Sequence, residues 1–113
     1  MSSGLSILNS VKGAIGLEVD QDEFDSDLVM FINARFRDLK QIGVPISNSF
    51  ILTGADDTWE NAVPDENYYY IMEYVTLKTR LRFDPPISSG LMTALNEAVK
   101  ECEWRLNHEY DLG

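Results

Sequence analysis

Apolar residues recur at helical spacing in four stretches of the chain, and the clearest stretch lies between Asp22 and Ile42. Acidic residues surround its start and basic residues lie near its end, an arrangement that complements the helix dipole. Gly43 is well placed as the C-terminal cap residue, and Pro45 prevents the helix from continuing. The pattern predicts a helix over residues 22–42 with an apolar face formed by Phe24, Leu28, Phe31, Ile32, Phe36, Leu39 and Ile42.

A shorter apolar stretch near the start of the chain predicts a helix over residues 3–15, which Ser2 or Ser3 could cap. Glycine is unfavourable inside a helix, so this helix should stop near Gly16. An acidic run then extends from Glu18 to Asp27 and leads into the helix at 22–42.

The C-terminal half of the chain predicts two helices that meet at a double proline. The first should begin near Asp65, which would cap it, and must end before Pro85. The second should be capped by one of the two serines at 88 and 89 and run to about Glu109. Its apolar row includes Leu91, Leu95, Val99, Cys102 and Leu106.

The helical period disappears between Val44 and Asp65. A short strand is expected at residues 50–52, and Trp59 should anchor the segment onto the helices. A loop of this length in a compact domain is often functional, and this one carries no basic residue, so it should present an acidic face. The predicted fold is therefore all-α, with about four helices in a small bundle and one long extended or hairpin loop between the second and third.

Charge and composition narrow the classes of partner. The chain has 113 residues, which fits a single domain over residues 1–113, and 44% of them are hydrophobic, as in globular proteins. The net charge of −10 argues against a basic phosphate-binding surface and against an anionic membrane as partner. No apolar stretch is long enough to span a bilayer, and the start lacks the pattern of a secretory signal. With a single cysteine, these features predict synthesis in a reducing cytoplasm.

The sequence offers no constellation that would support catalysis. Cys102 and His108 lie six positions apart on one predicted helix, and so on different faces, which makes a zinc site improbable. Cys102 falls in an apolar row and is expected to be a core residue. The acidic run 20–27 lacks the glycine and terminal glutamate of a calcium loop, and no glycine-rich phosphate loop is present. The expectation is a protein that is not an enzyme and carries no metal or cofactor.

Two aromatic and basic segments are candidate interaction surfaces. Three consecutive tyrosines at 68–70 point in three directions on a helix, so one or more of them could lie in a subunit interface. Arginines at 80 and 82 flank the proline corner together with Phe83 and Asp84. This corner can be read as a rigid connection in which Asp84 pairs with an arginine, or as a connection that also docks a partner.

Residues 74–107 resemble a family of small head–tail connector proteins of tailed phages and prophages. The resemblance rests on two motifs at this spacing, Phe-Asp-Pro-Pro at 83–86 and Glu-Trp-Arg-Leu-Asn at 103–107. The family pattern also fits the opening helix, the acidic segment and Phe31-Ile32-Asn33. Residues 44–65 resemble the family only in general character, so no detail is carried over to them.

The resemblance implies an all-α subunit that forms a ring, usually of twelve copies, beneath the portal at one vertex of the capsid. Such a ring extends the DNA channel, retains the packaged genome and offers a docking surface to a further connector or tail protein. DNA would pass through without specific binding. The candidate subunit or portal interface then comprises Tyr69, Arg80, Arg82, Phe83, Asp84, Trp104 and Arg105, and the candidate acidic channel or interface comprises Asp20, Asp22, Glu23, Asp56, Asp57 and Glu60.

Ring formation would join different faces of neighbouring subunits, with acidic residues of 18–27 or 56–66 meeting Arg35, Arg37, Arg80 or Arg82. The segment 109–113 is a candidate portal-contacting tail by family analogy. A competing interpretation is an acidic regulatory protein of phage origin that mimics DNA. A mimic should display carboxylates regularly over one surface, whereas basic residues interrupt two of the predicted helices here.

Overall fold

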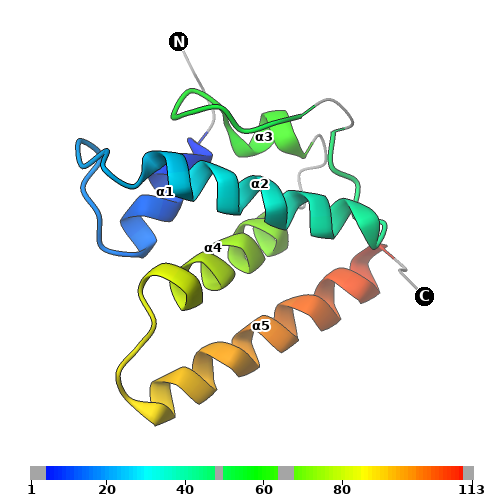
Figure 1. Cartoon of the computed structure of the whole chain (residues 1–113). Coiled ribbons are helices and arrows are strands. Elements are labelled where there is room, and N and C mark those ends of the chain that lie inside the picture. The colour runs from blue at the N-terminus through cyan, green and yellow to red at the C-terminus, as the bar shows by residue number, and fades with distance from the viewer. Residues whose placement is uncertain (1–4, 48–49, 64–67, 111–113) are drawn as a thin grey trace.

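The computed structural model describes residues 5–47, 50–63 and 68–110, which form five helices and no strand (Figure 1). The prediction of an all-α fold with four main helices is confirmed, and a short fifth helix lies inside the predicted loop. The helices are α1 (Ile7–Ala14), α2 (Asp25–Gln41), α3 (Trp59–Ala62), α4 (Tyr69–Phe83) and α5 (Ser89–Tyr110).

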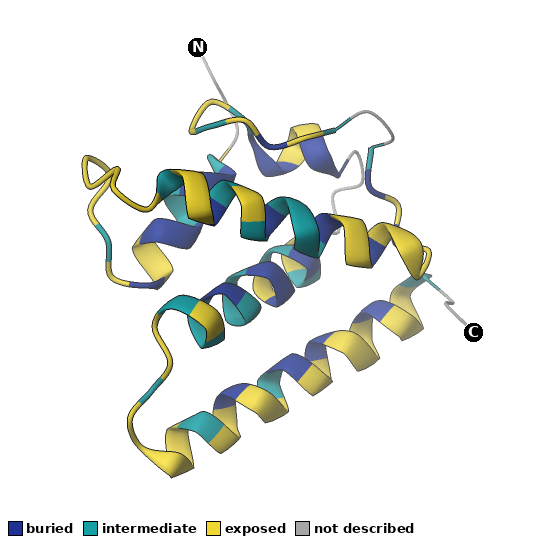
Figure 2. Cartoon of the chain, viewed as in Figure 1, coloured by how far each residue is buried: buried dark blue, intermediate teal, exposed yellow. Residues whose placement is uncertain are grey.

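Helix α4 holds the central position. It packs against α1 and α2 on one side and against α5 on the other (Figure 1). Its buried residues Ile71 and Val75 join Leu28 and Ile32 of α2 in one hydrophobic core. The outer face of α5 remains exposed along its length, as Figure 2 shows.

Helix ends follow the predicted stop signals more closely than the predicted start signals. Gly16 and Gly43 both adopt positive φ angles, of 86° and 104°, as expected for glycines that end α1 and α2. Helix α4 ends before the double proline, and the Ser88 hydroxyl accepts a hydrogen bond from the Leu91 amide at the start of α5. These stop signals and the Ser88 cap are confirmed.

The two predicted N-terminal starts are wrong. Helix α1 begins at Ile7 and is capped by Ser6, whose hydroxyl accepts from the Asn9 amide. The predicted caps, Ser2 and Ser3, lie outside the described residues. Helix α2 begins at Asp25 instead of Asp22, because residues 22–25 close a turn through a hydrogen bond from the Asp25 amide to the Asp22 carbonyl. The predicted start of α4 at Asp65 lies outside the described residues.

Three residues of the predicted apolar rows are exposed instead of buried. Phe24 lies in the turn ahead of α2, and Ile42 lies at its C-terminal end. Leu91 is in the first turn of α5, beyond the reach of the core. All three side chains are exposed, because each lies at a helix end that projects past the packed layer.

The predicted strand at 50–52 is also wrong, since the described residues contain no strand. The Asn33 side chain of α2 takes the place of a neighbouring strand by bonding both backbone groups of Leu52. It accepts from the Leu52 amide at 2.8 Å and donates to the Leu52 carbonyl at 3.0 Å. One side-chain amide therefore satisfies the backbone that a second strand would otherwise have to satisfy.

Trp59 anchors the long loop, as predicted. Its side chain is 0% exposed, packs edge-on against Phe36 with a centroid separation of 6.1 Å, and its Nε1 donates to the Ser10 hydroxyl. Thr58 and Asn61 form a reciprocal capping box that starts α3 at Trp59. The loop is thus fixed to both α1 and α2.

Candidate functional site

The proline corner after α4 presents a mixed aromatic and charged surface. Phe83 packs edge-on against Phe31 of α2, with centroids 5.5 Å apart, and the Arg82 guanidinium lies over the Phe83 ring. Arg82 and Asp84 are exposed, and the next apolar side chain, Ile87, is fully exposed. Among the described residues no ion pair joins Asp84 to an arginine, so the corner is shaped by aromatic packing and proline instead.

The three tyrosines at 68–70 take three environments, as their spacing on a helix requires. Tyr68 is buried and its hydroxyl donates to Glu60, while Tyr70 is half-buried on the side of α5. Tyr69 is exposed, and its ring lies 4.7 Å from that of Tyr68. Of the three, Tyr69 is therefore the one available to a partner.

Trp104 forms a second exposed aromatic surface on α5. Its side chain is 63% exposed and stacks face to face on His108, with ring centroids 5.2 Å apart. Trp104 lies fifteen residues beyond the start of α5 at Ser89, which is roughly 22 Å along a helix. The structure therefore separates the predicted interface residues into a group at the proline corner and a group near the other end of the α4–α5 pair.

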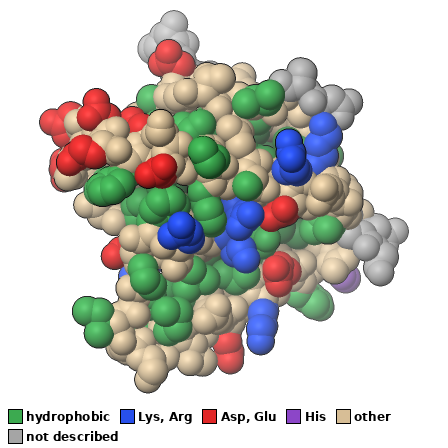
Figure 3. Space-filling view, in the orientation of Figure 1, with side chains coloured by type: hydrophobic (Ala, Val, Ile, Leu, Met, Phe, Trp, Pro, Cys, Tyr) green, Lys and Arg blue, Asp and Glu red, His purple; other side chains and the backbone are tan. Residues whose placement is uncertain are grey.

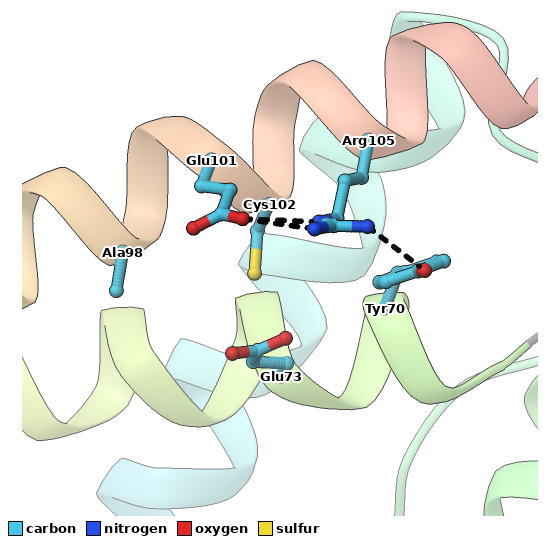
Figure 4. Close-up of a pocket in the computed structure, with 6 residues that line it drawn as sticks. All are labelled: Tyr70, Glu73, Ala98, Glu101, Cys102 and Arg105. Carbon is cyan, nitrogen blue, oxygen red and sulfur yellow. Dashed lines mark hydrogen bonds and ion pairs between the residues drawn. The ribbon is translucent and has the colours of Figure 1, made fainter.

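A cavity of about 260 Å³ lies between α4 and α5, lined by Tyr70, Glu73, Ala98, Glu101, Cys102 and Arg105 (Figure 4). Arg105 closes one side by donating to the Glu101 carboxylate, at 3.0 and 3.2 Å, and to the Tyr70 hydroxyl at 3.3 Å. The predicted interface residue Arg105 is thus engaged within its own chain.

Cys102 is a core residue, as predicted. Burial, together with a hydrogen bond to Glu73, raises the pKa of its thiol to about 12. A thiol that stays protonated at neutral pH is a poor nucleophile. The cavity consequently has the character of a packing gap between two helices, lined by one inert thiol and one internal ion pair.

We expect the raised pKa of Cys102 to make the fold less stable in alkaline solution. Below about pH 8.5 both folded and unfolded chains hold the thiol proton. Above that pH the unfolded chain releases it while the folded chain retains it, so stability falls as pH rises toward the folded pKa of about 12. Urea unfolding from pH 7 to 10.5 should show this decline. Cys102→Ala, which has no titrating thiol, should show a shallower decline, and equal slopes would contradict the assignment.

The acidic loop, defined here as residues 18–24, connects α1 and α2, and its Asp20, Asp22 and Glu23 are exposed. Figure 3 shows acidic side chains gathered at this end of the molecule. Its base is fixed by Lys12, whose side chain is only 1% exposed. The Lys12 ammonium lies 2.9 Å from the Asp25 carboxylate and donates to the Val19 carbonyl at 3.0 Å. A buried cation beneath the loop therefore holds its two ends together.

Two of the three candidate acidic residues at 56–60 form hydrogen bonds within the chain. Asp57 accepts from the backbone amide and the hydroxyl of Thr53, and these bonds lower the pKa of its carboxyl below the usual value. Glu60 accepts from the Tyr68 hydroxyl. Asp56 is exposed. Two of these three candidate acidic residues thus hold the loop in shape, and the predicted acidic surface lies chiefly at 18–24.

A groove of about 290 Å³ lies at the opposite end of α2, between that helix and the segment that follows it. Two basic side chains, Arg37 and Lys40, lie on its helical wall, and Ile51 on the other wall is 67% exposed. No acidic residue lines it among the described residues. The lining, which we call the basic groove, consists of Asn33, Phe36, Arg37, Lys40, Ile46, Ser47, Phe50 and Ile51.

Comparison with known proteins decides the family. Residues 7–113 match the phage connector protein family. The chain belongs to that family. The resemblance seen in the motifs at 83–86 and 103–107 is therefore confirmed, and the chain has a connector-type structural role in a phage. No protein of curated function and no solved structure matches it.

Two further observations describe this connector protein. Within the described ranges, no three histidine, cysteine or carboxylate side chains converge in a way that could hold a metal ion. None of the described helices combines the length and hydropathy needed to cross a bilayer.

The basic groove of the connector chain has no counterpart among the surfaces that the sequence predicts. The sequence predicts Arg37 only as one of several possible ion-pair partners, and it predicts a strand that includes Phe50 and Ile51. The groove exists because the chain turns back at Gly43, which brings residues 46, 47, 50 and 51 beside the C-terminal half of α2. The signal that the sequence offers is a pair of basic residues, Arg37 and Lys40, three positions apart on one helix just before Gly43.

Proposed function

We propose that the chain is a virion subunit that forms a ring beneath the portal and joins the DNA-filled head to the tail. The observation that carries the proposal is the family match over residues 7–113. The ring, of twelve copies, would extend the DNA channel. Its partners would be the portal protein and a further connector or tail protein, and it would be made in the host bacterial cytoplasm as a single domain.

The surface charge supports passage of DNA without specific binding. With a net charge of −10, the subunit repels the phosphate backbone, and acid on a channel wall lets DNA slide without adsorbing. The exposed acidic loop is the natural candidate for such a wall or for a joint between subunits. The rest of the docking surface would come from the proline corner with Arg80, Arg82, Phe83 and Asp84, and from Tyr69, Trp104 and Arg105.

Quantitative mass spectrometry of purified phage particles tests the proposal. We expect one copy of this chain for each portal subunit, because a connector ring matches the portal on which it sits. Matched peptides from the portal provide the internal standard. If the chain is absent from particles in which the portal is readily detected, the ring proposal fails and the acidic regulatory protein becomes the better explanation.

A further inference from the structure

Helix α2 carries two unlike surfaces at its two ends. The acidic loop precedes its N-terminus, and the basic groove flanks its C-terminal half, as the acidic and basic side chains beside these two ends in Figure 3 illustrate. We infer that neighbouring subunits join head to tail, with the acidic loop of one copy seated in the basic groove of the next. The inference rests on the proposed ring and names its joint.

The acidic loop has the shape and the chemistry of an inserting segment. Besides its carboxylates it exposes two apolar side chains, Val19 at 65% and Phe24 at 48%. Its conformation is fixed within its own chain, because Glu18 and Gln21 bond reciprocally and Lys12 holds its base. A loop that is ordered before binding loses little conformational entropy when it docks.

The basic groove offers the complementary features. Arg37 is exposed, and among the described residues no carboxylate pairs with it, whereas Arg35 on the same helix is already paired with Asp38 at 3.1 Å. The apolar wall formed by Phe50 and the exposed Ile51 lies beside these cations. In the joint, the carboxylates of the loop would therefore pair with the cations of the groove. The apolar side chains beside them on both surfaces would be buried against one another.

Geometry excludes a contact within one chain. Helix α2 has 17 residues and is therefore roughly 25 Å long, so the loop at its start cannot reach the groove at its end. A joint between two different surfaces leaves one free loop and one free groove on every pair of subunits. Such a heterologous joint repeats from subunit to subunit and forms a ring when its rotation closes, whereas a contact of like surfaces would stop at a dimer.

Cross-linking in assembled particles tests the joint. In a Cys102→Ala background, Val19→Cys and Ile51→Cys place one thiol on the loop and one beside the groove. Treatment with a short bismaleimide should give a ladder of covalent multimers when both substitutions are present. Either single substitution serves as the matched control and should leave monomers.

A double variant that is incorporated at normal copy number but gives only monomers, or only dimers, overturns the joint while the ring proposal stands. Absence of the unaltered chain from particles would overturn the ring proposal itself.

Charge exchange covers the case in which the cysteine variant is not incorporated. Arg37→Glu or Asp22→Arg alone should reduce incorporation at least about tenfold, since each places like charges at every joint. The two together restore opposite charges and should restore incorporation, whereas Lys100→Glu, an equal charge change on the exposed face of α5, should have little effect. A combined variant no better than the single ones would also overturn the joint.

Discussion

Replacing Trp59 with alanine is expected to lower the free energy of unfolding by about 3–5 kcal/mol. The indole is fully buried, packs on Phe36 and bonds to Ser10, so its removal leaves a cavity that connects three segments of the chain. Domains of this size have about 5–15 kcal/mol of total stability, so the variant should be close to unfolding. Chemical denaturation followed by circular dichroism measures the change.

The second tryptophan provides a matched control. Trp104→Ala removes the same side chain from an exposed position on α5, where it stacks on His108 alone among the described rings. The expected loss is within about 1 kcal/mol. Similar losses for the two variants would mean that Trp59 is not the anchor of the long loop.

Replacing Lys12 with methionine is expected to lower the free energy of unfolding by about 2–4 kcal/mol. Methionine keeps much of the buried apolar stem but removes the charge that pairs with Asp25 and the donor to the Val19 carbonyl. Loss of one partner of a buried pair costs about 3–5 kcal/mol. The expected loss is somewhat smaller than this because the Asp25 side chain is one-third exposed and can recover hydration.

A double variant separates the ion pair from packing. If Asp25→Asn is added to Lys12→Met, the uncompensated carboxylate is removed and part of the lost stability should return. Arg105→Met breaks the exposed pair with Glu101 and serves as the control, with an expected loss below about 1 kcal/mol. A neutral effect of Lys12→Met would show that the cation does not hold the loop.

Much of the fold could be predicted because its signals are local. Helical periodicity gave the four main helices, and glycine and proline gave their ends, since both residue types act through their own backbone geometry. The starts of α1 and α2 were less predictable. Several polar residues can cap a helix, and the one that does is selected by long-range contacts. For α1 this is the pairing of Ser6 with Thr58, whereas α2 has no side-chain cap and begins after the turn at residues 22–25.

The candidate interaction surfaces also differ in how far the sequence predicts them. The acidic loop and the proline corner could be predicted because each is contiguous in sequence. The basic groove and the bond between Asn33 and Leu52 require residues 19 positions apart, or on opposite sides of a turn, to meet in space. A local sequence pattern contains no information about such long-range contacts. It therefore assigned Leu52 to a strand, although its backbone is satisfied by a helix side chain.

The one-sided attachment of α5 sets an order of local opening. Four buried side chains hold this helix, chiefly against α4, whereas α4 itself is enclosed by the rest of the core. Of the described helices longer than one turn, α5 is therefore the one that can separate without breaking the packing of the other three against one another, and partial opening in native proteins proceeds through such separable units. A partner that binds the surface around Trp104 would thus pull on a helix whose main contact is with α4 alone. Repositioning α5 during docking would leave the packing of α1, α2 and α4 against one another in place.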